Sequence, residues 1–194
     1  MDGVLRGGVR LIDRLLSNSL GVYIFTDEPD CILRIQYTQA AHSVIIGNER
    51  ILKGEPILGI HVWNERMPKI PAQGATLDWA LEFRRRVIFS FREIAKEMRK
   101  DPKYEQARAL YGASVLFSFS DHIGGIRVLQ RLGFTVLPYQ RSMGKFGIFW
   151  ENLFSWWLMW TYNTASMNSR QFFNLQRTEI WMLADEFLRR YGTG

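Results

Sequence analysis

The segment GEPILGIHVWN, residues 54–64, is apolar on both faces of an extended chain, and no other feature restricts the fold as strongly. Alternate side chains of a strand point to opposite faces. The two faces carry Ile57, His61 and Trp63 on one side, and Leu58, Ile60 and Val62 on the other. A strand that buries both faces lies in the interior of a covered sheet. We therefore predict a central strand here.

Three further β-rich stretches come before this segment. They are VYIFTD, CILRIQYTQA and HSVIIGNERIL, residues 22–27, 31–40 and 42–52. The middle stretch alternates with period two, and residues 27–30 and the pair Gly47-Asn48 supply turn-forming side chains between the stretches. Short turns join strands that run antiparallel. The pattern therefore predicts a mixed, mainly antiparallel sheet.

Residues 77–100 change to the repeat of a long helix, with Thr76 as its N-cap and Asp101-Pro102 at its end. Its apolar stripe consists of Phe83, Val87, Phe91, Ile94 and Met98. The next elements that we predict are a short helix at Tyr104–Tyr111, a strand at Ala113–Phe119, a helix in GGIRVLQRLGF closed by Gly133, and a short edge strand in TVLPYQ with Pro138.

Helices are expected at both ends of the chain. An amphipathic pattern covers Val4–Leu20, a tryptophan-rich helix is predicted at Phe149–Tyr162, and a last helix at Thr178–Tyr191. The tryptophans either pack in the core or form a partner surface. The fold class is therefore α+β: one domain, residues 1–194, with a sheet-and-helix core at 1–145, flanking helices, and a tryptophan-rich helical tail at 146–194.

Charge and composition narrow the class of partner. The net charge is +6, but the basic residues are scattered, which argues against nucleic acid as a partner. One cysteine, Cys31, excludes an internal disulfide, and three separated histidines make a metal site unexpected. The longest apolar stretch, residues 147–163, contains Glu151 and is shorter than the ~20 residues of a membrane span. We expect a cytoplasmic protein, with a peripheral contact to anionic lipid at the inner face of the membrane left open.

The densest polar cluster directly follows the predicted central strand. Its candidate catalytic residues are His61 and Glu65, either of which could act as a general base, and its candidate substrate-binding residues are Trp63, Asn64 and Arg66. Ligands gather at the carboxyl ends of strands in open sheets, which supports this interpretation. The alternative is a loop cap in which Asn64 and Glu65 bind backbone amides and Arg66 pairs with Glu65.

Two other groups of residues are candidates for binding an anion. Ser120, Asp121 and His122 precede a predicted helix whose first amides could bind an anion, or they serve only as its N-cap. Arg85 lies opposite the apolar stripe of the long helix. It could bind lipid headgroups or phosphate, or it could belong to a solvated face.

Several segments together resemble the YkoP-like family of bacterial proteins. They are VRLIDRLLSNSLGV, LKGEPILGIHVWNERMP, RRVIFSFREIA and GGIRVLQRLGF. The stretch from Gly54 to Pro68 is the most specific of them. The family's domain occurs alone or fused to polysaccharide deacetylases, so the resemblance implies work on glycans or glycolipids of the cell envelope. It transfers no catalytic residue to this chain.

The segment VLFSFSDHIGGIRVLQRLGFTVLP is similar to the end of GNAT-type acyltransferases, where a strand, a helix and a Gly-Phe turn follow one another. The chain departs from that superfamily at residues 73–75, which lack its pyrophosphate-binding loop. We expect either an envelope-related acyl- or group-transferase that acts on an amine or hydroxyl, with acyl-CoA or an acyl-carrier protein as donor, or a non-catalytic module that binds a glycan or lipid headgroup. Nothing in the sequence indicates the oligomeric state.

Overall fold

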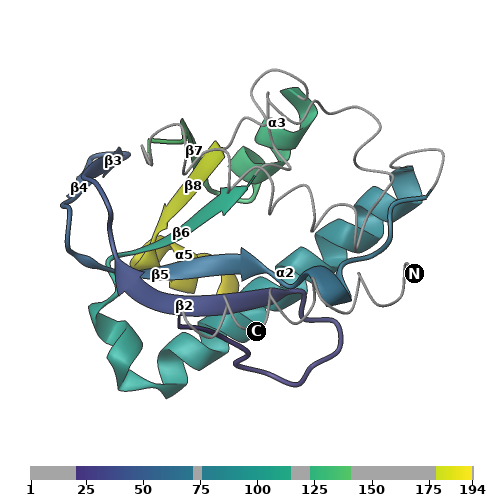
Figure 1. Ribbon diagram of the computed structural model, residues 1–194, viewed down its shortest axis with the longest axis horizontal. Helices are drawn as coiled ribbons and strands as arrows, with labels where there is room; N and C mark the ends of the chain where they lie inside the picture. Colours follow the sequence, from purple (N-terminus) through teal and green to yellow (C-terminus); the bar gives the residue numbers. More distant parts are fainter. Residues whose placement is uncertain (1–20, 72–75, 115–122, 141–177, 194) are drawn as a thin grey trace, which may run out of the picture.

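The computed structural model describes residues 21–71, 76–114, 123–140 and 178–193 (Figure 1). In this part of the chain six strands form one sheet in the order β1-β2-β5-β6-β8-β7, and β3 and β4 form a separate hairpin. The main-sheet strands are β1 (Val22–Tyr23), β2 (Leu33–Gln39), β5 (Pro56–Val62), β6 (Ala109–Ser114), β7 (Thr135–Pro138) and β8 (Thr178–Leu183), and the hairpin strands are β3 (Val44–Ile46) and β4 (Glu49–Ile51). Among the described strands only β5 and β6 pair in parallel, so the α+β class with a mainly antiparallel sheet is confirmed.

The predicted central strand is confirmed, because β5 lies between β2 and β6. Leu58 and Ile60 pack into the core beneath the helices, a side of the sheet that we call the helix face. Ile57 points the other way and packs with residues of the β3–β4 hairpin, a side that we call the hairpin face. The double-sided apolar pattern of the sequence thus corresponds to two cores, one on each face of the sheet.

The long helix α2 (Leu77–Lys100) has the predicted bounds. Thr76 caps its start by accepting a hydrogen bond from the backbone N–H of Trp79, and Asp101 ends it. Four residues of the predicted stripe, Val87, Phe91, Ile94 and Met98, are buried on the helix face. Ser90 is buried beside them, and its hydroxyl accepts a hydrogen bond of 2.9 Å from the N–H of Ile32. This bond ties the helix to the residue before β2.

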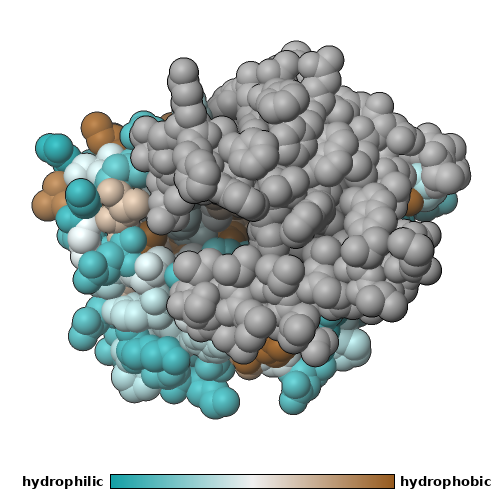
Figure 2. Space-filling view, viewed as in Figure 1, coloured by the Kyte–Doolittle hydropathy of each residue, from teal (hydrophilic) through white to brown (hydrophobic). Residues whose placement is uncertain are grey.

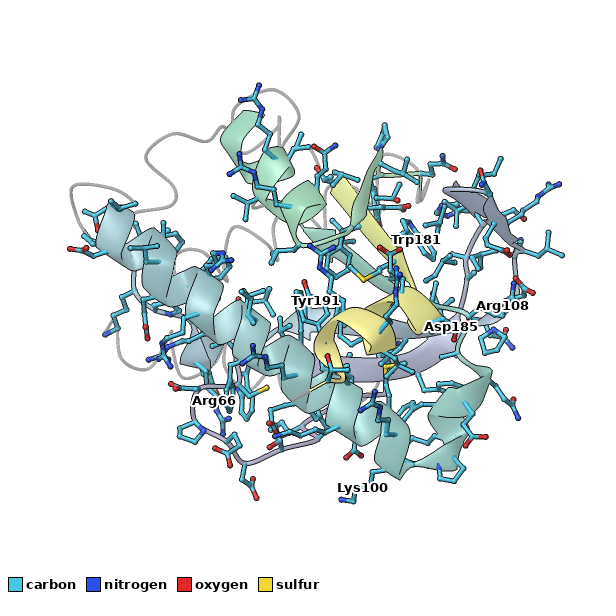
Figure 3. The ribbon with its side chains drawn as sticks, turned by 180° about the vertical axis from the view of Figure 1, so that it is seen from behind. Arg66, Lys100, Arg108, Trp181, Asp185 and Tyr191 are labelled. Atoms are coloured by element: carbon cyan, nitrogen blue, oxygen red, sulfur yellow. The ribbon has the colours of Figure 1, made fainter. Side chains whose placement is uncertain are left out.

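An aromatic cluster joins α2 to the last helix, α5 (Ala184–Tyr191). Phe91 lies 5.6 Å from Phe187 and 5.0 Å from Tyr191, measured between ring centroids. The Tyr191 hydroxyl donates a hydrogen bond of 2.7 Å to the carbonyl of Leu132. Burial raises the pKa of this phenol. The cluster packs α5 beside α2 and against β6 and β8 of the sheet, as the view from behind shows (Figure 3).

The expectations for residues 104–119 need correction. The predicted helix at Tyr104–Tyr111 is wrong: a 3₁₀ turn, η2 (Pro102–Gln106), is followed by β6, which begins at Ala109. The short apolar run after the turn pairs with β5 on one side and β8 on the other, and these tertiary contacts outweigh local helix propensity. The predicted strand at Ala113–Phe119 therefore begins earlier, and its residues after Ser114 lie outside the described part.

The elements that follow agree with the sequence. Helix α3 (Ile123–Arg131) ends where Gly133 adopts a φ of 95°, a left-handed conformation that suits glycine. The N–H of Phe134 donates to the carbonyl of Leu129, which closes this turn. Strand β7 lies at the edge of the sheet, the position that Pro138 predicts.

The predicted helix at Thr178–Tyr191 is half wrong. Its first six residues form β8, and helix α5 begins only at Ala184. Ile180, Leu183 and Phe187 fit a helical spacing, but β8 pairs with β6 and β7, and side chains of its two faces pack into the two cores. The strand predicted at residues 22–27 is limited to β1. The helices predicted at Val4–Leu20 and Phe149–Tyr162 lie outside the described residues.

The described surface is mixed. Hydrophilic residues dominate around η2 and the end of α2 (Figure 2). Hydrophobic residues are exposed on the outer side of the hairpin, where Ile45 and Leu52 reach the surface. Among the helices of the described segments, none combines the length and the apolar character that crossing a bilayer requires.

Candidate functional site

The parallel strands β5 and β6 separate toward their carboxyl ends (Figure 1). Their ladder joins Ile57–Gly59 with Ala109–Tyr111, yet β5 continues to Val62 and β6 to Ser114. Each strand stays paired with its other neighbour, β2 or β8, to its end. We call the stretch formed by residues 60–62 and 112–114 the strand divergence. Ligands of open sheets bind at such carboxyl ends, so the divergence is a candidate binding site.

Polar side chains flank the divergence on the hairpin face. Arg34 of β2 lies opposite His61 of β5, and Glu179 of β8 lies opposite Ala113 of β6. The parallel register, continued by two residues, places His61 level with Ala113. Ala113 is exposed, whereas Arg34 and Glu179 are buried. A small exposed residue therefore lies between a histidine on one side and a carboxylate on the other.

His61 is held by a neighbour on β2. Its Nε2 lies 2.9 Å from Oε1 of Gln36. Burial, with a further contribution from the charge of Arg34, lowers the pKa of His61 to about 4. A Cβ added at Gly59 would lie 3.2 Å from His61 Nε2, so the glycine makes room for the ring. The imidazole is thus neutral near pH 7, where it forms hydrogen bonds but is a weak proton acceptor.

The turn after β5 contains four of the predicted site residues, and its contacts differ from those of His61. Residues Asn64–Arg66 form a 3₁₀ turn, η1. The guanidinium of Arg66 lies 3.7 Å from the ring centroid of Trp63 and donates hydrogen bonds to the carbonyls of Glu28 and Cys31. Trp63 is buried, and its Nε1 donates to Glu65 at 3.4 Å. These contacts fasten the turn to the segment before β2, so the roles of Trp63, Asn64, Glu65 and Arg66 in binding or catalysis stay predictions.

The other predicted residues divide between an ion-pair network and the undescribed segments. Arg85 binds Asp30 at 2.8 Å and Glu82 at 2.9 Å on the exposed side of α2. A hydrogen bond from Arg85, with a second one from Arg86, lowers the pKa of Glu82 to about 2. A hydrogen bond from Arg85 also lowers the pKa of Asp30. This arrangement favours the solvated-face alternative for Arg85. Residues 120–122, with Ser120, Asp121 and His122, lie outside the described part.

Replacing Arg85 with alanine is expected to leave the urea midpoint of unfolding unchanged within experimental error. Both carboxylate side chains are 36% exposed, and ion pairs near the surface contribute little stability and are screened by salt. Urea titrations of wild type and Arg85→Ala at low and high salt measure this. A clear fall of the midpoint at low salt would show that the network stabilises the start of β2.

A second polar group on the hairpin face was missed by the sequence analysis. Glu179 is fully buried, and its Oε2 lies 3.2 Å from Nε2 of His42 and accepts a hydrogen bond of 3.1 Å from Nε1 of Trp181. Its Oε1 accepts a bond of 3.2 Å from the N–H of Gln140. Trp181 packs between β8 and the hairpin and lies 4.6 Å from the ring centroid of Tyr111 (Figure 3). Because a helix was predicted for residues 178–183, the strand alternation that puts Glu179 and Trp181 on one face was not recognised. The signal in the sequence was a glutamate within an apolar stretch that could also form a strand.

Comparison with known proteins gives one positive finding. No curated protein and no solved structure matches the chain. The family model described as the YkoP domain matches residues 10–191, which is nearly the whole sequence. The chain therefore belongs to the YkoP domain family.

Proposed function

We propose that the chain is an acyl- or group-transferase that binds an extended donor at the strand divergence. The single observation that carries the proposal is the early end of the β5–β6 ladder, beside which His61, Arg34 and Glu179 lie. The acceptor is an amine or hydroxyl of a glycan or glycolipid of the bacterial envelope. The donor is an acyl-CoA or an acyl-carrier protein.

The chemistry of strand edges supports a donor at this place. An extended ligand with amide groups can bind the N–H and C=O groups of a strand much as an added strand would. The arm that carries the acyl group in both donors has such amides. At the divergence the described chain provides no second strand for the facing edges of β5 and β6. The order of β6, α3, the Gly133-Phe134 turn and β7 also agrees with the acyltransferase-like pattern of the sequence.

The electrostatics of the hairpin face suggest roles for the flanking residues. His61, neutral near pH 7 and bonded to Gln36, would orient a substrate by hydrogen bonding. The buried positive charge of Arg34 would stabilise negative charge that develops during transfer. In this arrangement the acceptor's proton goes to another group, because a pKa of about 4 is poorly matched to proton acceptance at neutral pH.

Ala113→Leu is expected to weaken donor binding by at least about tenfold, or ~1.4 kcal/mol. Ala113 is exposed at the divergence, so a larger side chain fills the proposed site without entering either core. The measurement is the shift of the melting temperature of wild type and variant with acetyl-CoA, palmitoyl-CoA and a loaded acyl-carrier protein. Ala80→Leu, the same change at an exposed position of α2, is the matched control and should bind as wild type does.

Vesicles provide the opposing arm of this experiment. If phosphatidylglycerol vesicles shift the melting temperature and no acyl donor does, the chain is a headgroup-binding module and the transferase proposal fails. Donor binding that Ala113→Leu leaves intact would remove the divergence as the site. Release of free thiol from acetyl-CoA in the presence of glucosamine, measured with a thiol reagent, then tests transfer itself.

A further inference from the structure

We propose that His42 and Glu179 form the acid–base pair of the transfer, in which His42 accepts the proton of the acceptor. The inference deepens the proposed function and rests on it. It concerns two residues that the sequence pattern did not single out. Its basis is a buried carboxylate, a histidine within ion-pair distance of that carboxylate, and the position of both beside the strand divergence.

The carboxylate of Glu179 is held on both of its oxygens. Oε2 accepts from Trp181 and contacts His42, while Oε1 accepts from the backbone N–H of Gln140. The side chain is fully buried on a strand that lies within the sheet. A buried charge is costly unless donors or an opposite charge compensate it, and apolar residues of similar size often serve stability equally well. A glutamate with this set of partners is therefore better explained by a function than by packing.

His42 lies beside the carboxylate and beside an aromatic ring. It lies in the loop between β2 and β3, and its Nε2 is buried 3.2 Å from Glu179. The ring meets Trp181 edge to face at 5.9 Å. The side chain is 21% exposed although Nε2 is buried, so other atoms of the side chain reach solvent. A carboxylate that holds one imidazole nitrogen leaves the other to take a proton, which is the arrangement of a general base.

Nε2 of His42 does not form a hydrogen bond with Glu179. The nitrogen lies within ion-pair distance of Oε2, but its direction does not satisfy hydrogen-bond geometry. Catalytic contacts often have such geometry before substrate binds and tighten in the complex. The hairpin packs on the sheet through side chains of Val44, Ile46 and Ile51. This packing holds the loop that carries His42 close to Glu179.

The pair lies where an acceptor would meet the donor. Glu179 is the cross-strand partner of Ala113, the exposed residue at the divergence. Tyr111, the next residue along β6 on the same face, is half-buried and packs against the buried ring of Trp181. An aromatic side chain next to polar groups suits the mixed surface of a sugar amine or hydroxyl. The structure thus places an acid–base pair on one side of the divergence and His61 on the other.

The transfer step balances with an acyl thioester as donor. The acceptor nitrogen or oxygen attacks the acyl carbon and forms the new bond, while its proton passes to the free ring nitrogen of His42. The carbon–sulfur bond breaks, and the thiolate leaves and takes that proton from the imidazolium. Glu179 keeps the ring in place and stabilises the imidazolium during the step, so it is a positioning residue. No oxidant or reductant is needed.

His42→Ala is expected to lower kcat at least about 100-fold while donor binding is retained. The assay is thiol release from acetyl-CoA with glucosamine as the acceptor, and donor binding is followed by the melting-temperature shift. Free imidazole added to His42→Ala should restore part of the rate, which a purely structural role would not allow. The partly exposed loop position makes this variant the safer one for folding.

Glu179→Gln tests the positioning role. We expect kcat to fall about tenfold or more with an unchanged KM for acetyl-CoA, and Glu179→Asp to recover part of the loss because the charge is kept. Glu49→Gln, the same change at an exposed position of β4, is the control and should transfer at the wild-type rate.

The failures of the two proposals can be told apart. If His42→Ala transfers at the wild-type rate, the acid–base pair is overturned and the transferase proposal stands. A loss in His42→Ala that imidazole does not restore, with acetyl-CoA binding also lost, likewise overturns it. Wild type that binds no donor removes the proposed function, and wild type that binds a donor but releases no thiol overturns both the transferase proposal and the pair.

Discussion

Phe187→Ala is expected to lower the free energy of unfolding by about 3–5 kcal/mol. Phe187 has no exposed surface and lies 5.6 Å from Phe91 and 5.1 Å from Tyr191, measured between ring centroids. Alanine removes the ring and leaves a cavity where α5 packs against α2 and the sheet. The transfer free energy of the lost ring and the cost of that cavity add, because a close-packed core relaxes only in part.

Urea unfolding followed by tryptophan fluorescence measures the change. Arg189→Ala, two residues further along α5 and exposed, is the matched control and should change the free energy by less than about 0.5 kcal/mol. A loss below about 1 kcal/mol for Phe187→Ala would contradict the aromatic cluster as described. The cluster supports β6 and β8 from the helix face.

Acidification from pH 6.5 to pH 4 is expected to destabilise wild type by about 3 kcal/mol more than it destabilises His61→Gln. The pKa of His61 in the folded chain is about 4, below its ordinary value of 6.5, because the ring is buried and lies near Arg34. The unfolded chain therefore takes up the proton first as the pH falls. Stability linked to this group is complete above pH 6.5 and is lost progressively toward pH 4.

Urea titrations of both proteins at intervals between pH 7 and pH 4 provide the test. Glutamine keeps a hydrogen-bonding group beside Gln36 but does not titrate, which makes it the suitable replacement. Acid-sensitive carboxylates such as Asp30 and Glu82 are present in both proteins, so their contribution cancels in the difference. Parallel curves for the two proteins would show that His61 is not buried in the neutral form.

Those parts of the fold that depend on local pattern could be predicted from the sequence. Helix α2 has a one-sided apolar stripe, an N-cap at Thr76 and a stop at Asp101-Pro102, all of which act within a few residues. The two apolar faces of β5 indicated a central strand because they require cover on both sides. Gly133 marked the end of α3 for a similarly local reason, its positive φ.

The parts of the fold that depend on distant partners could not be predicted from the sequence. Strand β8 has apolar residues at helical spacing, and only its position between β6 and β7 makes it extended. The same misassignment hid Glu179, which on a helix would have looked like a solvated charge. His42 lies in a loop some 137 positions away from Glu179, and no spacing rule connects them. For the turn after β5, the chemistry of Arg66 was recognised, but its partners are backbone carbonyls of the segment before β2.

The place of β8 in the sheet has a consequence for how the chain is made. This strand, which comes late in the sequence, fills the position between β6 and β7, and residues on both of its faces enter the two cores. In a nascent chain whose residues 178–191 are still inside the ribosome, the described strands leave β6 with one open edge and β7 without a partner. Pairing of such distant strands is slow, and open strand edges favour aggregation. Synthesis must therefore have passed residue 183 before the sheet can close, and until then chaperones have an exposed strand edge to bind.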